Sequence, residues 1–196
     1  MGGIYSLAVV LGIVLVFGGI LVAIYNRLVR GQILAREAFS GVDVQLKRRH
    51  DLIPNLVNTV GGYADFERSV LDEVIRLRSQ AMGDQSIPDK QRDENALSNG
   101  LKTLFAVAEN YPDLKAGSNF LDLQQQLSGI EDNLQKARRY YNGAVRDYNI
   151  LVRSFPSNLV AGMFEFPPAE FFELESLAER EVPEVKFKNG KKEQGE

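Results

Sequence analysis

Apolar residues recur at steps of three and four along most of the chain, the spacing that lines one face of a helix. The longest unbroken series predicts a single helix over residues 120–155. Its members are Phe120, Leu123, Leu127, Ile130, Leu134, Ala137, Tyr141, Ala144, Tyr148, Leu151 and Phe155. The alternation approximates a 3.5-residue repeat, which is typical of helices packed along a seam.

An earlier apolar series runs from Phe39 to Ala81, and two of its positions hold Arg49 and Glu67 instead of an apolar residue. Pro54 lies inside this series, where it lacks a backbone N–H and crowds the preceding turn. We therefore expect a kink or break over residues 52–54. The pair Gly61-Gly62 is a second weak point, since glycine costs about 1 kcal/mol relative to alanine inside a helix.

The remaining elements are marked by proline and by capping residues. Residues 83–88 read as a loop, with Pro88 suited to the first turn of a helix that stops before Pro112. Ser118 or Asn119 can cap the helix over 120–155. The only strand-like run is residues 182–187, and residues 188–196 are charged and predict a disordered tail.

The first part of the chain predicts a membrane span. Residues 4–25 contain no charged side chain, and 22 helical residues extend about 33 Å, enough to cross a hydrocarbon core of about 30 Å. Tyr5 and Tyr25 flank this run, as tyrosine does at the headgroup level. We expect Tyr5, Tyr25, Arg27 and Arg30 to contact the membrane.

Three other interpretations of this segment are disfavoured. A cleaved signal peptide would need basic residues before a shorter apolar run. The first six residues fit a myristoylation pattern, but Gly2 opens directly into the apolar helix, so a chance match is favoured. A core helix of a small soluble protein is rarely apolar on every face.

Charge predicts the orientation of the span. Residues 1–26 carry no Lys or Arg, whereas residues 27–50 carry six, against two acidic residues. Basic residues that flank a span stay in the cytoplasm. We expect a bacterial inner-membrane protein with its N-terminus outside and its helical domain cytoplasmic. The absence of cysteine agrees with a reducing compartment without deciding the point.

The charge of the remainder limits the class of partner. The whole chain has net charge −3, and removing the +4 of residues 27–50 leaves −7 for residues 51–196. Such an acidic body argues against nucleic-acid binding, which requires a basic surface. The basic residues near the span either contact anionic lipid headgroups or serve only to set the orientation.

Together these patterns predict an all-α protein. An N-terminal transmembrane helix is followed by an elongated antiparallel helical bundle with coiled-coil-like heptad packing. The expected divisions are a membrane anchor over residues 1–26, a cytoplasmic helical bundle over residues 27–187, and the tail over residues 188–196.

Several stretches resemble the signature of the LemA family of bacterial membrane proteins, and together they cover nearly the whole chain. They are Tyr25–Val29, Val42–Val57 with its run QLKRRHDLIPNLV, Gly62–Ala64, Ala137–Asn142, Val145–Asn149, Phe155–Ala161, Phe171–Glu173 and Val182–Phe187. The resemblance implies a single-span protein with a cytoplasmic helical bundle, and it implies no established activity. The family includes a magnetosome-associated member.

One position departs from the family pattern. The family has a histidine before the glutamate of its Tyr-Ala-x-x-Glu stretch, where this chain has Phe66 before Glu67. A metal or acid–base role that depends on this histidine is therefore absent here.

The sequence offers little for catalysis, and we expect no enzyme, no cofactor and no metal site. His50 is the only histidine, there is no cysteine, and no phosphate-binding or nucleophile motif occurs. His50 could act as a base with Asp51 or Glu67 as its partner. A packing role near Pro54 is favoured over that one.

Two groups of residues are candidates for interfaces. The candidate polar interface, between helices or between subunits, comprises Arg48, Arg49, His50, Asp51, Asn55, Arg138, Arg139, Asn142, Arg146, Asp147 and Asn149. The candidate apolar docking residues are Phe155, Phe164, Phe166, Phe171 and Phe172. We expect the aromatic segment to fold back over the bundle; docking onto a second subunit or onto the bilayer surface is the alternative.

Three functions stay open at this point. The favoured one is a non-enzymatic, membrane-anchored scaffold that forms a homo-oligomer and organises or shapes the membrane. The second is an adaptor that presents its bundle to a protein partner, such as a membrane protease system. The third and weakest is an enzyme that uses His50.

Overall fold

The computed structural model describes residues 2–63, 66–83 and 86–172, and every regular element within these ranges is an α-helix. The helices are α1 (Gly2–Gly61), α2 (Arg68–Ala81), α3 (Ile87–Ala108), α4 (Pro112–Lys115), α5 (Ser118–Arg153) and α6 (Ser157–Met163). The all-α prediction is confirmed. The segments expected as a strand over 182–187 and as a tail over 188–196 lie outside the described residues.

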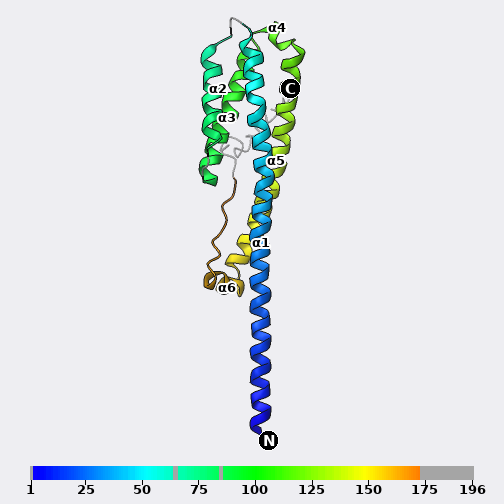
Figure 1. Ribbon diagram of the computed structural model, residues 1–196, viewed down its shortest axis with the longest axis vertical. Helices are drawn as coiled ribbons and strands as arrows, with labels where there is room; N and C mark the ends of the chain where they lie inside the picture. Colours follow the sequence, from blue (N-terminus) through cyan, green and yellow to red (C-terminus); the bar gives the residue numbers. More distant parts are fainter. Residues whose placement is uncertain (1, 64–65, 84–85, 173–196) are drawn as a thin grey trace, which may run out of the picture.

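Helix α1 is one continuous helix of 60 residues, which at 1.5 Å per residue extends about 90 Å. Its N-terminal part carries large apolar side chains that are exposed, and it is long and apolar enough to cross a membrane. Its C-terminal part packs antiparallel against α5 (Figure 1). The same helix therefore has two environments along its length.

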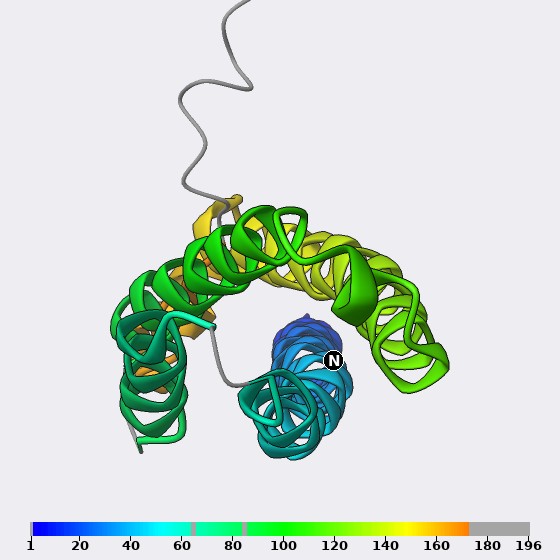
Figure 2. The same ribbon diagram turned by 90° about the horizontal axis from the view of Figure 1, so that it is seen from above.

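The bundle consists of two helix pairs. Helix α1 packs mainly on α5, and α2 packs mainly on α3. Seen from above, α2, α3 and α5 form an arc with α1 on its inner side (Figure 2). The short helix α4 links α3 to α5, and α6 packs on α1 where α1 leaves the bundle.

Apolar residues form three separate clusters along the bundle. The cluster farthest from the apolar end of α1 contains Ile53, Leu97 and Phe120, which belong to α1, α3 and α5. A middle cluster joins α1 to α5, and a small one around Leu28 holds α6. Burying each such side chain stabilises the fold by about 1.5–3 kcal/mol relative to its exposure.

Of the kink or break expected at residues 52–54, the break does not occur, since α1 continues through Pro54. In a helix, Pro54 cannot donate to the carbonyl oxygen of His50, four residues earlier. Arg78 of α2 takes this role, because its Nε donates to the His50 carbonyl oxygen at 2.7 Å. The neighbouring helix thereby satisfies the acceptor that the proline leaves free.

Other helix ends match the sequence in part. Helix α1 ends at Gly61, as the glycine pair predicts, and Pro88 lies in the first turn of α3. The expected cap of α5 is wrong: Gly117 holds the N-cap position, with no side-chain hydrogen bond. Helix α5 also ends two residues before Phe155, because the chain turns there towards α6.

The contact between Arg78 and the His50 carbonyl gives a testable prediction. Arg78→Ala leaves a partly buried carbonyl without a donor, so it should lower the free energy of unfolding by about 1–3 kcal/mol. Pro54→Ala restores the intrahelical donor, so in that background Arg78→Ala should have a clearly smaller effect. Urea unfolding followed by circular dichroism measures both, and equal effects in the two backgrounds would contradict the account.

Candidate functional site

Arg49 occupies one of the two positions where the apolar series of the sequence is interrupted, and only 1% of its surface is exposed. Its Nη2 contacts Oε2 of the equally buried Glu94 on α3. Its Nη1 donates to the hydroxyl of Ser98 at 2.8 Å and to Oε2 of Glu131 on α5 at 3.2 Å. One guanidinium therefore connects α1, α3 and α5.

Glu94 has a second partner on α1. Nε2 of His50 lies 2.9 Å from Oε1 of Glu94, as an ion-pair contact without the alignment of a full hydrogen bond. Burial alone would raise the pKa of the Glu94 carboxyl. The contact with His50 and the charge of Arg49 outweigh burial and hold this pKa below its usual value.

These residues, here called the charged layer (Arg49, His50, Glu94, Ser98 and Glu131), separate two apolar clusters. On α1, Leu46 belongs to the middle cluster and Ile53 to the far one, with Arg49 between them. A charge inside a core stabilises only when it is paired, because leaving water is costly. The layer therefore favours the alignment of helices in which all of its partners meet.

The structure places other members of the candidate polar interface on the surface. Arg48, Asp51, Asn55, Arg139, Arg146 and Asp147 are exposed. Asp51 lies 3.5 Å from Nζ of Lys47, and Nε of Arg146 lies 3.1 Å from Oδ1 of Asp147. Such exposed pairs contribute about 0–1 kcal/mol.

Asn142 and Asn149 hold an extended segment of residues 167–172, here called the strap. Asn149 donates from Nδ2 to the carbonyl of Ala169 at 2.9 Å and accepts from the amide of Ala169 at 2.8 Å. Asn142 makes the same pair of bonds with Phe172, at 3.0 and 2.9 Å. Each side chain thus satisfies both backbone groups of one strap residue.

Two tyrosines complete this arrangement, so that a Tyr-Asn pair repeats after seven residues on α5. Tyr141 donates to the carbonyl of Glu170 at 2.7 Å, and Tyr148 donates to that of Pro167 at 2.9 Å. Burial, and then the charge of Glu170, raise the pKa of Tyr141 to about 12. Because this pKa is raised, the protonated Tyr141 stabilises the folded protein. This contribution is complete below about pH 10 and is lost as pH rises through about 12.

The candidate apolar docking residues divide into two groups. Phe172 is buried, and its ring centre lies 4.8 Å from Cζ of Arg138; Phe166 packs edge-on against Tyr25. Phe155, Phe164 and Phe171 keep 80, 53 and 40% of their surface exposed. The aromatic segment over residues 155–172 therefore folds back over the bundle, but only some of its aromatic side chains are packed there.

Helix α6 lies at the level where the apolar part of α1 ends. Its Val160 and Ala161 are buried against Leu28, three residues beyond Tyr25. Its other face exposes Leu159 and Met163, at 65 and 67%. Together with Phe155 and Phe164 these residues form an exposed apolar surface, here called the α6 surface.

The residues expected to contact membrane are all exposed. Tyr5 keeps 71% of its surface free and Tyr25 keeps 38%, while Arg27 and Arg30 follow on the outside of α1. Phe164 covers one side of the Tyr25 ring, with centroids 4.9 Å apart. Tyr25 therefore lies between α6 and the apolar segment.

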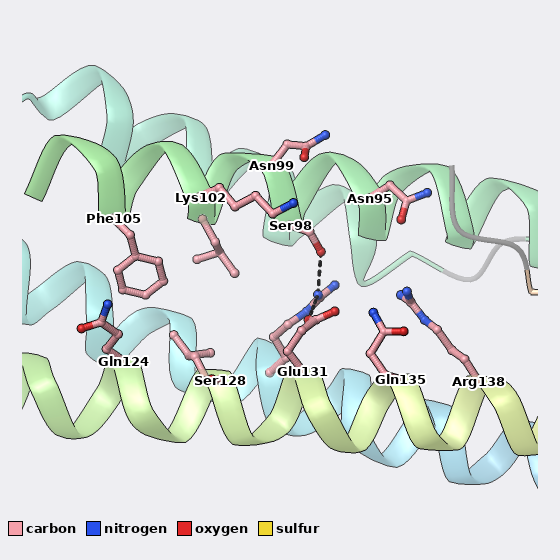
Figure 3. Close-up of a pocket in the computed structure, with 13 residues that line it drawn as sticks. Asn95, Ser98, Asn99, Lys102, Phe105, Gln124, Ser128, Glu131, Gln135 and Arg138 are labelled. Carbon is pink, nitrogen blue, oxygen red and sulfur yellow. Dashed lines mark hydrogen bonds and ion pairs between the residues drawn. The ribbon is translucent and has the colours of Figure 1, made fainter. Parts of the chain in front are cut away.

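A cleft of about 480 Å³ opens between α3 and α5, next to the charged layer (Figure 3). Arg138 extends from α5 towards α3 beside Gln135 and faces Asn95 (Figure 3). Arg138 is 3% exposed, and its Nε and Nη2 have no hydrogen-bond partner among the described residues. Burial, and then the charge of Arg49, lower the pKa of Arg138.

Sequence reasoning missed Glu94, Ser98, Glu131 and Arg78. A signal existed for Glu94, which lies three residues before Leu97 and so continues the apolar series of α3 with a charge. Within the described residues no group of three His, Asp or Glu side chains is arranged to hold a metal ion. The charged layer pairs charged side chains of α1, α3 and α5 with one another.

Comparison with known proteins places the chain among bacterial relatives. The LemA family model matches residues 38–187. Protein LemA of Metamycoplasma hominis is 25% identical over 84% of this chain and 75% of its own length. Magnetosome protein MamQ 2 of Paramagnetospirillum magneticum is 26% identical over 68% of this chain, and magnetosome protein MamQ of Magnetospirillum gryphiswaldense is 23% identical over 76%. The chain spans 59 and 64% of the length of these two magnetosome proteins.

Removing Arg49 should be strongly destabilising. Arg49→Ala leaves Glu94 buried with only His50 beside it, so we expect a loss of about 3–5 kcal/mol in the free energy of unfolding. The exposed neighbour serves as the control, since Arg48→Ala should change this quantity by less than about 0.5 kcal/mol. Urea denaturation provides the comparison, and similar values for the two variants would refute a central role for the layer.

The asparagine contacts predict a local effect. Asn149→Ala removes both bonds to Ala169, so amide exchange at residues 169–172, the strap positions that carry an amide hydrogen, should accelerate by about tenfold or more, corresponding to two hydrogen bonds of about 1 kcal/mol each. Asn133→Ala, at an exposed site on the same helix, should leave it unchanged. Hydrogen–deuterium exchange read by mass spectrometry tests this, and unchanged strap exchange in Asn149→Ala would show that the strap is held by other contacts.

Proposed function

The chain belongs to the LemA family, and from this we propose that it is a membrane-anchored, non-enzymatic scaffold that self-associates and organises or shapes the membrane. Its bundle lies in the cytoplasm and its N-terminus outside a bacterial inner membrane. This orientation is supported by the six basic residues within 27–50, against none before them.

The observation that carries this proposal is the continuity of α1. Its apolar side chains from Leu7 to Ile20 are largely exposed, so lipid or other spans would cover them. The helix then continues without a break to Gly61 inside the bundle. A stiff connection of this kind fixes the angle between the bundle and the bilayer, whereas a flexible tether would leave it free.

The α6 surface extends this membrane contact. On the opposite face of α6, Val160 and Ala161 pack on Leu28, which lies about 4.5 Å along α1 from Tyr25. Phe155, Leu159 and Met163 are thus at headgroup depth, where exposed apolar side chains enter the boundary between headgroups and acyl chains. Insertion beside the span would spread one leaflet only, and many copies would bend the membrane.

Self-association has weaker support in the apolar segment. A shallow groove on this part of α1 is lined by Val9, Gly12, Ile13, Val16, Phe17 and Ile20. Spans can approach one another closely at a small residue such as Gly12. Relatives called magnetosome proteins agree with a scaffold, because their names attach them to a cellular structure rather than to a reaction.

An adaptor role is the second candidate. The net charge of −7 over residues 51–196 offers an acidic surface to a partner protein such as a membrane protease system. An enzyme that uses His50 is the weakest candidate, because only 7% of His50 is exposed and its Nε2 faces Glu94.

Purified full-length protein in mild detergent and in lipid vesicles tests the scaffold. We expect light scattering to give a mass of several chains, and electron microscopy to show vesicles whose shape the protein has changed. A protein that is monomeric at every concentration would refute self-association. Crosslinking in cells separates the adaptor, which predicts contacts with one other protein rather than with further copies.

The proposed role of the α6 surface in shaping the membrane is tested by a separate variant. Replacing Phe155, Leu159 and Met163 with serine should leave the protein folded and anchored but reduce vesicle deformation several-fold, because the apolar area that enters the leaflet is lost. Ile75→Ser on α2, which also replaces an exposed apolar residue, is the matched control and should deform vesicles as the wild type does. Equal vesicle deformation by both variants would show that the α6 surface does not shape the membrane.

A further inference from the structure

Among the residues that line the cleft between α3 and α5, the buried polar side-chain atoms without a partner are all hydrogen-bond donors. Arg138 leaves Nε and Nη2 without a partner, and Nδ2 of Asn95 and Nε of Arg49 are likewise unpaired among the described residues. All three residues line the same cleft. Unpaired donors that are buried, above all those of a charged group, favour a ligand that supplies acceptors.

The charges of the lining agree with the donors. Arg49, Lys102 and Arg138 are cationic, against the single carboxylate of Glu131. That carboxylate accepts from Arg49 at 3.2 Å, and neither Nε nor Nη2 of Arg138 bonds to it. Burial and then the charge of Arg49 lower the pKa of Arg138, and the charges of Glu131 and Glu94 offset this lowering only in part. An anion between the two guanidiniums would offset it further.

We propose that this cleft binds a small soluble oxyanion, a carboxylate or a phosphate, with the guanidinium of Arg138 as its main contact. A planar guanidinium suits such groups because it can donate two parallel hydrogen bonds. Asn95 donates from the α3 side, and Phe172 of the strap supports Arg138 from behind, 4.8 Å from its Cζ. The cleft volume of about 480 Å³ is that of a small-molecule site.

The position of the cleft decides the source of the anion. Arg49 lies 24 residues beyond Tyr25 on the same helix, about 36 Å from the end of the apolar segment. A phospholipid headgroup does not reach that far. The ligand therefore comes from the aqueous side, and the inference stands whether or not the chain is a scaffold.

Isothermal titration calorimetry on the full-length protein in detergent tests this proposal. Inorganic phosphate and succinate are the two probes, each titrated against chloride at constant ionic strength. We expect one of them to bind saturably with a stoichiometry of one, and the probe that binds identifies the oxyanion class. No saturable binding of either probe would overturn the proposal.

Variants assign the binding to the cleft. Arg138→Gln should weaken the affinity by about tenfold or more, the loss expected for charge-assisted hydrogen bonds. Arg139→Gln removes the same charge from an exposed neighbouring position and should bind as the wild type does. Should Arg138→Gln fail to fold by circular dichroism, Asn95→Ala replaces it and should also bind more weakly. Equal weakening in Arg139→Gln, or unchanged binding in the cleft variants, would overturn the site.

Discussion

The buried contact between Arg49 and Glu94 is the interaction on which the arrangement of the long helices depends. Both side chains are almost wholly removed from water, so each is tolerable only where the other is present. Glu131 brings α5 to the same guanidinium, and Arg78 brings α2 to the carbonyl of His50 one residue away. A shift of α1 or α3 by one turn would leave a buried charge without its partner. Apolar packing on either side of the layer would tolerate such a shift far better.

Helix α1 has two different surroundings along its length, an exposed apolar part and a part packed in the bundle. Helix α1 must be apolar on all sides over its first part and must then present one apolar face to α5. Its continuity past Pro54 relies on the donor from Arg78. The strap closes the other side, since Asn142 and Asn149 fix it to α5 and so fix the path of the chain beyond α6. These contacts hold α1 continuous and fix the helices packed on it, so the bundle is joined to the apolar segment without a break.

The sequence predicts the helices well and their contacts poorly, for a physical reason. Apolar spacing is a local signal, so the series from Phe120 to Leu151 marks α5 almost to its ends. The interruption at Arg49 is visible as well, but the partner of a buried charge belongs to another helix. The break expected at Pro54 is wrong because its compensation comes from Arg78, 24 residues further on. Asn142 and Asn149 stand out as polar residues beside the apolar seam, yet their partners are backbone groups of the strap, which no side-chain pattern reveals.

The central claim is that α1 joins the apolar segment rigidly to the bundle. The chain contains no cysteine, so spin labels can be attached at Val22→Cys and Arg48→Cys, two exposed positions on α1. Pulsed electron–electron double resonance in lipid nanodiscs then measures the distance between the two labels. The account predicts a narrow distribution near about 39 Å, the length of 26 helical residues. A broad distribution, or one centred at a much shorter distance, would show a hinge between the two parts and would contradict the claim.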